Sequence, residues 1–194
     1  MIIRKYDPKD SRQIVAVYRD SYDGLRASRG GKHPDSVVDK VLSQSDQQIL
    51  RYLTKNAQIV VAEMDGEIAG MGAIKINWLH RILGSAYSTG HYVKKKFQKG
   101  KSGVNVGSAL RKATIEKASQ LGCRKIYGYS TMEAVNFHRK FGAEFYPKYD
   151  NYLKYPDAMA HYYEIILRPS FWNGIRIEPY VSDRSFLGKL LFKV

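Results

Sequence analysis

The stretch KSGVNVGSALRKATIEKASQLG, residues 101–122, predicts a glycine-containing loop that runs directly into a helix. Helical spacing of apolar residues begins near Val106 and ends near Leu121, and Gly122 suits the position just after a helix. The first amides of a helix have no partner within the helix and carry a partial positive charge. The stretch therefore predicts an anion site, with phosphate as the ligand that suits it best.

The groups expected to surround a phosphate are backbone amides of the loop and of the first helical turn. They belong to Gly103, Val104, Asn105, Val106, Gly107 and Ser108. Lys99 and Lys101 add positive charge beside them. Two common phosphate motifs do not fit, because a P-loop needs a glycine where the chain has Lys95, and the loop glycines are spaced unlike a dinucleotide fingerprint. A plain glycine-rich connection is the alternative.

Strands and helices alternate in the remaining patterns. Strands are expected at 2–6, at 58–76 as a hairpin turning at Asp65-Gly66, at 85–93, at 124–130, and in the final pair 143–147 and 161–167. Helices are expected after Asp10, which would cap its helix together with Gln13, and at 37–42, 49–53, 106–121 and 133–142. A strand–helix–strand order around the glycine loop indicates a parallel pair, and the hairpins make the sheet mixed.

Composition sets the class of protein. The chain of 194 residues suits one domain with a good-sized core, and no apolar run has the length of a membrane span. The charged N-terminus differs from a signal peptide, so the expected compartment is cytoplasmic. The single cysteine, Cys123, is expected to be buried, and the scattered histidines show no metal-ligand spacing, so no metal is expected. The net charge of +14 favours anionic partners without choosing among them.

Two sequence blocks resemble the GCN5-related N-acetyltransferase (GNAT) superfamily. The first joins the strand GHYV (90–93) to GSALRKATIEKA (107–118), and the second joins KIYGYS (125–130) to AVNFHRKFGAEF (134–145). The resemblance covers residues 1–168, which we expect to form an acyl-CoA N-acyltransferase domain.

That resemblance implies an α/β (α+β) fold with a mixed, mostly antiparallel twisted sheet. A central parallel strand pair is expected to splay at the coenzyme site, with helices on both faces of the sheet. Residues 169–194 are expected to form a C-terminal extension that adds an edge strand, packs on a partner subunit or trails in solvent. A homodimer is one expectation.

The chain departs from the family pattern at three places. Its glycine loop is longer than usual. Asn105 stands where the family usually has its first glycine, and Ser102 where it usually has arginine or glutamine, a polar group that Gln98 would supply. His138 stands where the family usually has a tyrosine general acid.

What the resemblance implies is direct transfer of an acetyl group from acetyl-coenzyme A to an amine in a ternary complex. The backbone of Tyr92 and Val93 would contact the pantetheine arm, and an amide there would polarise the thioester carbonyl. The pyrophosphate would lie on residues 103–108. Thr131 and Ala134 match positions that line the thiol end of the coenzyme.

Two proton transfers are needed, one from the acceptor ammonium and one to the departing thiolate. His138 is the candidate proton donor by its motif position, with a solvated helix histidine as the alternative. His91 is the candidate base because it lies beside the expected thioester position. Glu63, Glu133 or a water relay are weaker candidates for the base.

The acceptor is expected to be a small-molecule or peptide amine. The basic segment 26–34 favours one that also bears a carboxylate or phosphate. A basic nucleic-acid-binding module is a rival interpretation, supported by the net charge and by aromatic residues near lysines. An inactive acyl-CoA sensor with the same fold is another, and no membrane partner is expected.

Overall fold

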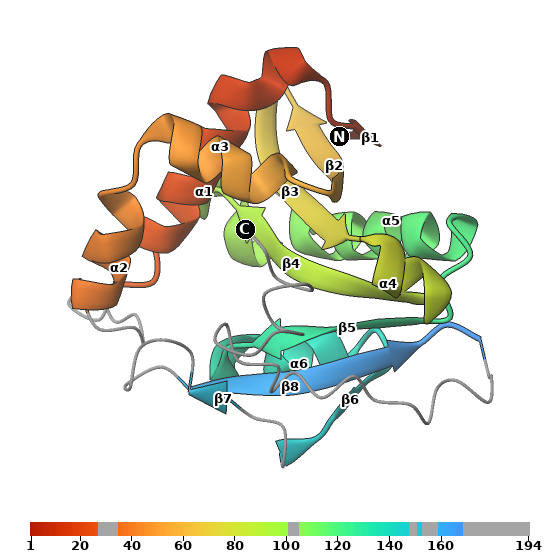
Figure 1. Ribbon diagram of the computed structural model, residues 1–194. Helices are drawn as coiled ribbons and strands as arrows, with labels where there is room; N and C mark the ends of the chain where they lie inside the picture. The colour runs from red at the N-terminus through yellow and green to blue at the C-terminus, as the bar shows by residue number, and fades with distance from the viewer. Residues whose placement is uncertain (27–34, 101–104, 148–150, 153–158, 169–194) are drawn as a thin grey trace. The chain divides into compact units, whose positions relative to one another are not determined.

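A computed structural model describes residues 1–26, 35–100, 105–147, 151–152 and 159–168 (Figure 1). The described chain divides into two compact units. The first contains Met1–Ile74 and Thr89–Glu116, and the second contains Lys75–Ser88 and the described residues from Lys117 onward. The predicted extension 169–194 lies outside the described residues, so the proposed boundary before it stays a prediction.

Helices and strands follow the predicted order. The strands are β1 Ile2–Lys5, β2 Ala57–Met64, β3 Glu67–Lys75, β4 Ser85–Val93, β5 Lys125–Ser130, β6 Ala143–Phe145, β7 Asn151–Tyr152 and β8 Met159–Ile166. The α-helices are α1 Ser11–Asp23, α2 Asp35–Leu42, α3 Asp46–Thr54, α4 Trp78–Ile82, α5 Val106–Gln120 and α6 Val135–Arg139. Short 3₁₀ segments are η1 Pro8–Asp10, η3 Lys95–Gly100 and η4 Met132–Ala134. The short elements α4 and β7 were not predicted. Among the described helices, none has both the length and the apolar character needed to cross a membrane.

Strands β1, β2, β3 and β4 are neighbours in that order in the first unit. Strand β1 runs antiparallel to β2, with Ile2 opposite Glu63. Asp65 and Gly66 join β2 to β3 with φ angles of 52° and 78°. Two successive positive φ angles are what a tight hairpin turn requires, so the predicted hairpin is confirmed.

Both faces of the first-unit sheet are covered by helices. On one face, Ile14 of α1, Ile49 of α3 and Met71 of β3 lie in one buried cluster. On the other face, Val106 and Leu110 of α5 pack in a second buried cluster with β2 and β3. Burying a side chain of this size contributes about 1.5–3 kcal/mol, so the two layers stabilise the unit jointly. The expected helices on both sheet faces are confirmed here.

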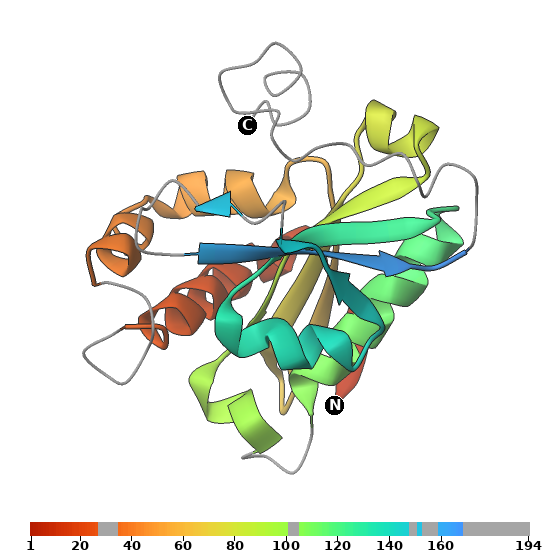
Figure 2. The same cartoon turned by 90° about the horizontal axis from the view of Figure 1, so that it is seen from below.

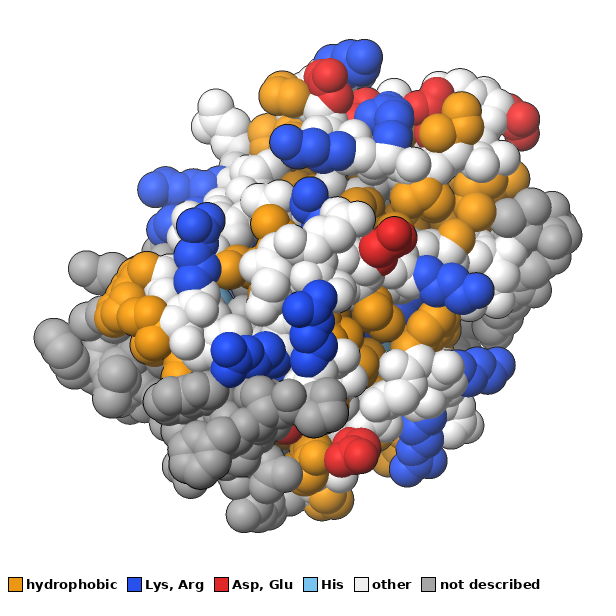
Figure 3. All heavy atoms as spheres, turned by 90° about the vertical axis from the view of Figure 1, so that its right-hand side faces the viewer, with side chains coloured by type: hydrophobic (Ala, Val, Ile, Leu, Met, Phe, Trp, Pro, Cys, Tyr) orange, Lys and Arg blue, Asp and Glu red, His pale blue; other side chains and the backbone are white. Residues whose placement is uncertain are grey.

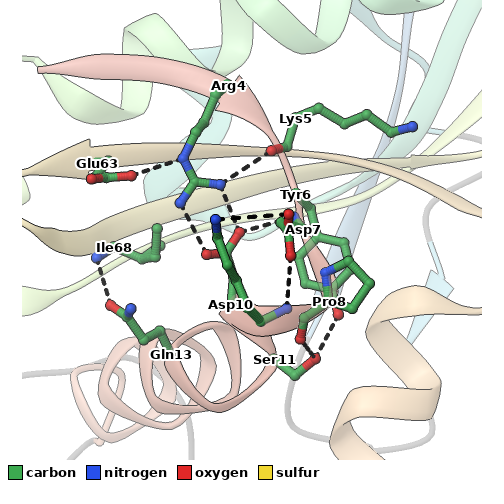
Figure 4. A network of polar contacts seen from close by, with 11 residues as sticks. Arg4, Lys5, Tyr6, Asp7, Pro8, Asp10, Ser11, Gln13, Glu63 and Ile68 are labelled. Carbon is green, nitrogen blue, oxygen red and sulfur yellow. Dashed lines mark hydrogen bonds and ion pairs between the residues drawn. The ribbon is translucent and has the colours of Figure 1, made fainter.

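A charged network ties β1 to the start of α1 (Figure 4). The Arg4 guanidinium donates to both carboxylate oxygens of Asp10, at 2.7 and 2.9 Å, and its Nε donates to Glu63 at 2.8 Å. Asp10 is buried, and its hydrogen bonds with Arg4 hold the pKa of its carboxyl below the usual value. The ion pair therefore stabilises the fold chiefly by keeping a buried carboxylate satisfied.

The predicted capping box of Asp10 with Gln13 is wrong. Asp10 makes no side-chain cap to α1, and the capping box is formed one turn earlier by Asp7 and Asp10 around η1. The Gln13 side chain instead accepts a hydrogen bond from the backbone of Ile68 at 2.9 Å. The sequence pattern predicted the start of the helix correctly. It could not show that Asp10 binds Arg4 or that Gln13 binds the backbone of β3.

Strands β4, β5, β8 and β6 are neighbours in that order in the second unit, and β7 pairs with β8. Residues 85–88 of β4 run parallel to residues 125–128 of β5, which confirms the predicted parallel pair. Strand β8 is antiparallel to β5 on one side and to β6 on the other. The sheet is therefore mixed and mostly antiparallel, as expected.

Polar and aromatic side chains dominate one face of the second-unit sheet. Tyr127 and Tyr162 form its buried cluster. Glu164 is buried there, and one of its carboxylate oxygens accepts from Lys125 Nζ at 3.0 Å and from the Tyr162 hydroxyl at 2.7 Å. Helix α6 packs on the opposite face, against β8 (Figure 2).

The His80 ring joins α4 to this cluster. Its Nδ1 accepts from the backbone amide of Asn77 at 3.1 Å, so Nε2 carries the proton that is donated to the Tyr127 hydroxyl at 2.7 Å. Burial lowers the pKa of His80 to about 4. The neutral imidazole is therefore the form that the folded unit holds.

We expect the stability of the protein to fall between pH 7 and pH 5 because of His80. In that range the unfolded chain binds a proton at His80, with a pKa of about 6.5, whereas the folded chain does not. The free energy of unfolding should drop by about 2 kcal/mol more in the wild type than in His80→Phe. Urea denaturation at several pH values measures this, and parallel curves for the two proteins would disprove it.

Candidate functional site

Gly90 gives strand β4 an irregular backbone. Its φ angle is 136°, a conformation that favours glycine. A Cβ added there would lie 2.8 Å from the Tyr92 hydroxyl oxygen, so space also excludes a larger residue. The group that approaches Gly90 is therefore the Tyr92 side chain of the same strand.

The pairing of β4 with β5 ends at Ser88 opposite Gly128. Strand β4 continues beyond that point through Thr89–Val93 in the first unit. Tyr92 is buried, and its ring packs against Tyr18 with centroids 4.9 Å apart. The backbone of Tyr92 and Val93 thus lies past the end of the parallel pair, where the resemblance expects the pantetheine arm.

The Gln98 side chain forms a hydrogen bond with the backbone of β4. Its side-chain Nε2 donates to the carbonyl oxygen of Val93 at 2.7 Å. This bond holds η3 against the end of β4. The contact of Gln98 with phosphate stays a prediction, and the carbonyl of Val93 already has a donor.

The N-terminus of α5 has the chemistry of an anion site. Asn105 caps the helix, because its side-chain oxygen accepts from the Ser108 amide at 3.0 Å. The amides of Val106 and Gly107 lie between Asn105 and Ser108 in the first turn, and this turn contains no acidic residue. The donors present here fit a diphosphate, because amides and the helix dipole both favour negative charge.

The far end of α5 is fixed by Gly122. Its φ angle is 78°, and the amide of Cys123 donates to the Ala118 carbonyl at 3.0 Å. This is the hydrogen bond of a glycine-terminated helix, and it confirms the predicted role of Gly122. The helix axis is therefore anchored at both ends by local sequence.

Three lysines before the loop are engaged in ion pairs. Lys94 and Lys96 both pair with Glu67, the former at 3.2 Å, and Lys95 pairs with Asp23 at 3.0 Å. Hydrogen bonds with Lys96 and Lys94 lower the pKa of Glu67. The positive charges of these three lysines are therefore paired with carboxylates of the first unit.

Four of the predicted phosphate-binding residues lie wholly or partly outside the described structure. Lys101, Gly103 and Val104 lie outside the described residues, as does most of the basic segment 26–34. For Lys99 only the backbone is described, within η3.

His91 points toward α5. Its Nε2 lies 2.9 Å from the Thr114 hydroxyl, which itself donates to the carbonyl of Arg111 at 2.9 Å. Since the hydroxyl has one proton, His91 Nε2 must be the donor in this chain of hydrogen bonds. A Cβ added to Gly72 would lie 2.9 Å from the His91 ring, so the ring fills the space between β3 and α5. Its predicted role as a base stays a prediction.

Among the weaker base candidates, Glu63 forms the ion pair with Arg4 described above. The side chain of Glu133 lies outside the described part of the chain. Neither observation adds support for a catalytic carboxylate.

His138 lies in the second unit and is buried on α6. Its ring stacks on Tyr163 of β8, with centroids 4.4 Å apart and planes 21° apart. Phe137 approaches the same ring edge-on at 5.2 Å. The alternative of a solvated helix histidine is therefore wrong, and the ring is held in one plane by its neighbours.

The turn before α6 carries the two positions matched to the thiol end. Thr131 stands at the start of η4, where its carbonyl accepts from the Ser130 hydroxyl at 2.8 Å and from the Ala134 amide at 3.0 Å. Ala134 is the residue immediately before α6. The turn thus has a defined backbone, while its contact with the coenzyme stays a prediction.

Tyr163 is a residue that the sequence interpretation missed. A Cβ added to Gly128 would lie 3.1 Å from the Tyr163 hydroxyl oxygen and 3.0 Å from the carbonyl oxygen of Ser88. Tyr163 thus links the His138 ring to the point where the β4–β5 pairing ends. The sequence predicted a strand at 161–167, but it could not show that α6 packs on the side chain of Tyr163.

In the described part of the chain, no group of three or more histidine, cysteine, aspartate or glutamate side chains is placed to hold a metal ion.

The positive side chains visible on one face of the protein do not form a single patch. On the face shown in Figure 3, lysine and arginine side chains are separated by uncharged and hydrophobic ones.

A sequence model described as "Acetyltransferase (GNAT) family" matches residues 22–143. The match includes β4, α5 and His138. No curated protein matches the sequence significantly.

Several solved structures share the fold. PaiA N-acetyltransferase from Thermoplasma acidophilum, in complex with coenzyme A, has a TM-score of 0.65 at 15% identity, over 85% of this chain and 98% of that one. A GCN5-related N-acetyltransferase from Rhodopseudomonas palustris has a TM-score of 0.67 at 16% identity, over 86% and 95%. The ribosomal-protein-S18-alanine N-acetyltransferase from Escherichia coli has a TM-score of 0.58 at 11% identity, over 87% and 95%. At these identities the likeness shows the fold alone.

Proposed function

Because the chain belongs to the acetyltransferase (GNAT) family, we propose that it transfers an acetyl group from acetyl-coenzyme A to a primary amine. The observation that carries this proposal is the N-terminus of α5. There, Asn105 caps a helix whose first turn contains Gly107 and no acidic residue. Along the chain, this helix is the next α-helix after the irregular strand β4. Solved structures of similar fold include two complexes with coenzyme A, which supports the same donor for this chain.

The residues proposed to hold acetyl-coenzyme A lie along the end of β4 and the start of α5. Amides of Val106 and Gly107 would bind the diphosphate, with Lys99, Lys101 and the loop amides as further predicted donors. The backbone of Tyr92 and Val93 would position the pantetheine arm. Thr131 and Ala134 are proposed to line the thiol end.

Acetyl-coenzyme A supplies the acetyl group as a thioester. In the transfer, a bond forms between the acceptor nitrogen and the carbonyl carbon while the carbon–sulfur bond breaks. The ammonium proton leaves to a base, and the thiolate gains a proton, so that an N-acetyl amine and free thiol result. We assign the second proton transfer to His138, while His91 is a weaker candidate for the first.

The proposed class of acceptor is inferred from the charge of one segment of the sequence. The basic segment 26–34 favours an amine that also carries a carboxylate or a phosphate. Arg26 itself already pairs with Asp23 at 2.9 Å and with Asp39 at 2.7 Å, so this support comes from the other residues of the segment. The proposed acceptor is the amine of a small molecule or of a peptide.

A thiol-release assay over a panel of amines tests the proposed function. Cys123 is the single cysteine of the chain, it is buried, and burial raises its pKa. A thiol-reactive dye should therefore report mainly on released coenzyme A. Release that depends on an amine supports the enzyme. Coenzyme binding without release from any amine would instead favour the sensor.

His138→Phe should lower the turnover number at least about tenfold while leaving the affinity for coenzyme A nearly unchanged. Phenylalanine keeps an aromatic ring against Tyr163, so the fold should be preserved, whereas the proton donor is lost. His138→Tyr is the matched control, because it restores a donor of the type that the family usually has. Steady-state kinetics and calorimetry measure the two effects, and an unaltered turnover number in His138→Phe would remove His138 from the mechanism.

A further inference from the structure

The Tyr92 side chain folds back over its own strand. Its hydroxyl donates to the carbonyl oxygen of Thr89 at 3.2 Å, across Gly90. Thr89 is also held from the other side, because its own hydroxyl donates to the Ala73 carbonyl of β3 at 3.2 Å. The strand is thus fixed at Thr89, immediately after its pairing with β5 ends at Ser88.

The direction of the hydrogen bonds around Tyr92 is determined. A carbonyl oxygen can only accept, so the single hydroxyl proton of Tyr92 is committed to Thr89. Burial raises the pKa of Tyr92 well above its usual value, so the hydroxyl keeps its proton at any physiological pH.

The Tyr92 ring is held in place by other aromatic rings. Tyr18 and Tyr22 of α1 lie with ring centroids 4.9 and 6.0 Å from it. The ring also leaves no room for a side chain at Gly90. Tyr52 of α3 packs on Tyr18 with ring centroids 6.1 Å apart, so the cluster couples α1 and α3 to the irregular backbone of β4.

We infer that the Tyr92 hydroxyl is a positioning group for the donor coenzyme, because it holds the Thr89 carbonyl across Gly90 and so fixes the backbone along which the pantetheine arm lies. This inference rests on the proposed function. It gives the Tyr92 side chain a role in binding the pantetheine arm, which was otherwise assigned to the backbone of Tyr92 and Val93 alone. The clasp consists of Tyr92, Thr89 and Gly90. Its loss should loosen the strand without removing any group that contacts the diphosphate.

Tyr92→Phe tests this inference, because it removes the clasp and keeps the ring. Calorimetry should compare coenzyme A with 3′-phosphoadenosine 5′-diphosphate, which lacks the pantetheine arm. We expect the dissociation constant for coenzyme A to rise about five- to tenfold, the effect of one lost hydrogen bond, and that for the nucleotide to stay unchanged. Equal affinities of wild type and variant for coenzyme A would overturn the inference.

Tyr127→Phe is the matched control. It also removes a buried tyrosine hydroxyl with a hydrogen-bond partner, here His80 in the second unit. It should lower the melting temperature by a similar amount, yet leave both dissociation constants unchanged. If Tyr127→Phe weakens coenzyme A as much as Tyr92→Phe does, the effect is general destabilisation and the inference fails.

Hydrogen exchange provides a readout without ligand. Amides of Thr89–Val93 should exchange faster in Tyr92→Phe than in the wild type, and at the wild-type rate in Tyr127→Phe. Unchanged exchange in Tyr92→Phe would show that no clasp exists. If exchange accelerates as expected but the wild type binds neither ligand, the clasp is real and the proposed function, with the positioning role, fails.

Discussion

Lys125→Met should lower the free energy of unfolding by about 3–5 kcal/mol, the range measured when one partner of a buried ion pair is removed. Lys125 is 3% exposed and Glu164 is 1% exposed. In the variant the buried carboxylate loses its cation and keeps the hydrogen bond from the Tyr162 hydroxyl. A lost cation in this setting costs more than a lost surface charge, because water cannot replace it.

A double variant separates the ion pair from side-chain packing. In Lys125→Met/Glu164→Leu both charges are gone, and we expect the protein to recover most of the stability lost in Lys125→Met. Lys112→Met, on the exposed side of α5, is the surface control and should change stability by less than about 0.5 kcal/mol. Urea denaturation measures all three variants. A loss in Lys125→Met no larger than in the control would contradict the account of this pair.

Ser108→Glu should raise stability and weaken coenzyme binding at once. Ser108 is the third residue of α5, and a glutamate there would complete a capping box with Asn105, worth about 0.5–1 kcal/mol. The same carboxylate would repel a diphosphate bound at this helix end. The dissociation constant for coenzyme A should therefore rise by a factor of about ten or more.

Ser108→Gln is the neutral partner of that variant. Glutamine has the same length and also suits a capping box, but it carries no charge. Thermal melts and calorimetry should show similar stability for the two variants and a large difference in affinity that shrinks with added salt. Equal affinities would show that the anion does not bind at the start of α5.

Local signals predicted the elements that position the candidate site. The Asp65-Gly66 turn, the apolar spacing of 106–121 and Gly122 each specify their geometry within a few residues, and the structure follows them. These features depend on neighbours in the sequence, and for that reason a single sequence reveals them.

Features that depend on distant partners were not predicted. The ion pairs of Lys94 and Lys96 with Glu67 require knowing that β3 lies beside the end of β4. The pair of Lys125 with Glu164 requires knowing that β8 inserts between β5 and β6. A charged residue in a β pattern looks the same whether it faces water or a buried partner.

The candidate catalytic residues show the same limit. The motif located His138, but its stacking on Tyr163 comes from the packing of α6 on β8. The alternation of side chains along a strand allows His91 to face either side of the sheet, and its hydrogen bond to Thr114 shows that it faces α5.

Calorimetric titration of the wild-type protein with acetyl-coenzyme A tests the central claim most directly. The account predicts one coenzyme per chain, with a dissociation constant on the order of micromolar, and a stabilisation of about 2.7 kcal/mol at a hundredfold excess over that constant. No heat of binding and an unchanged melting temperature at millimolar coenzyme would contradict it.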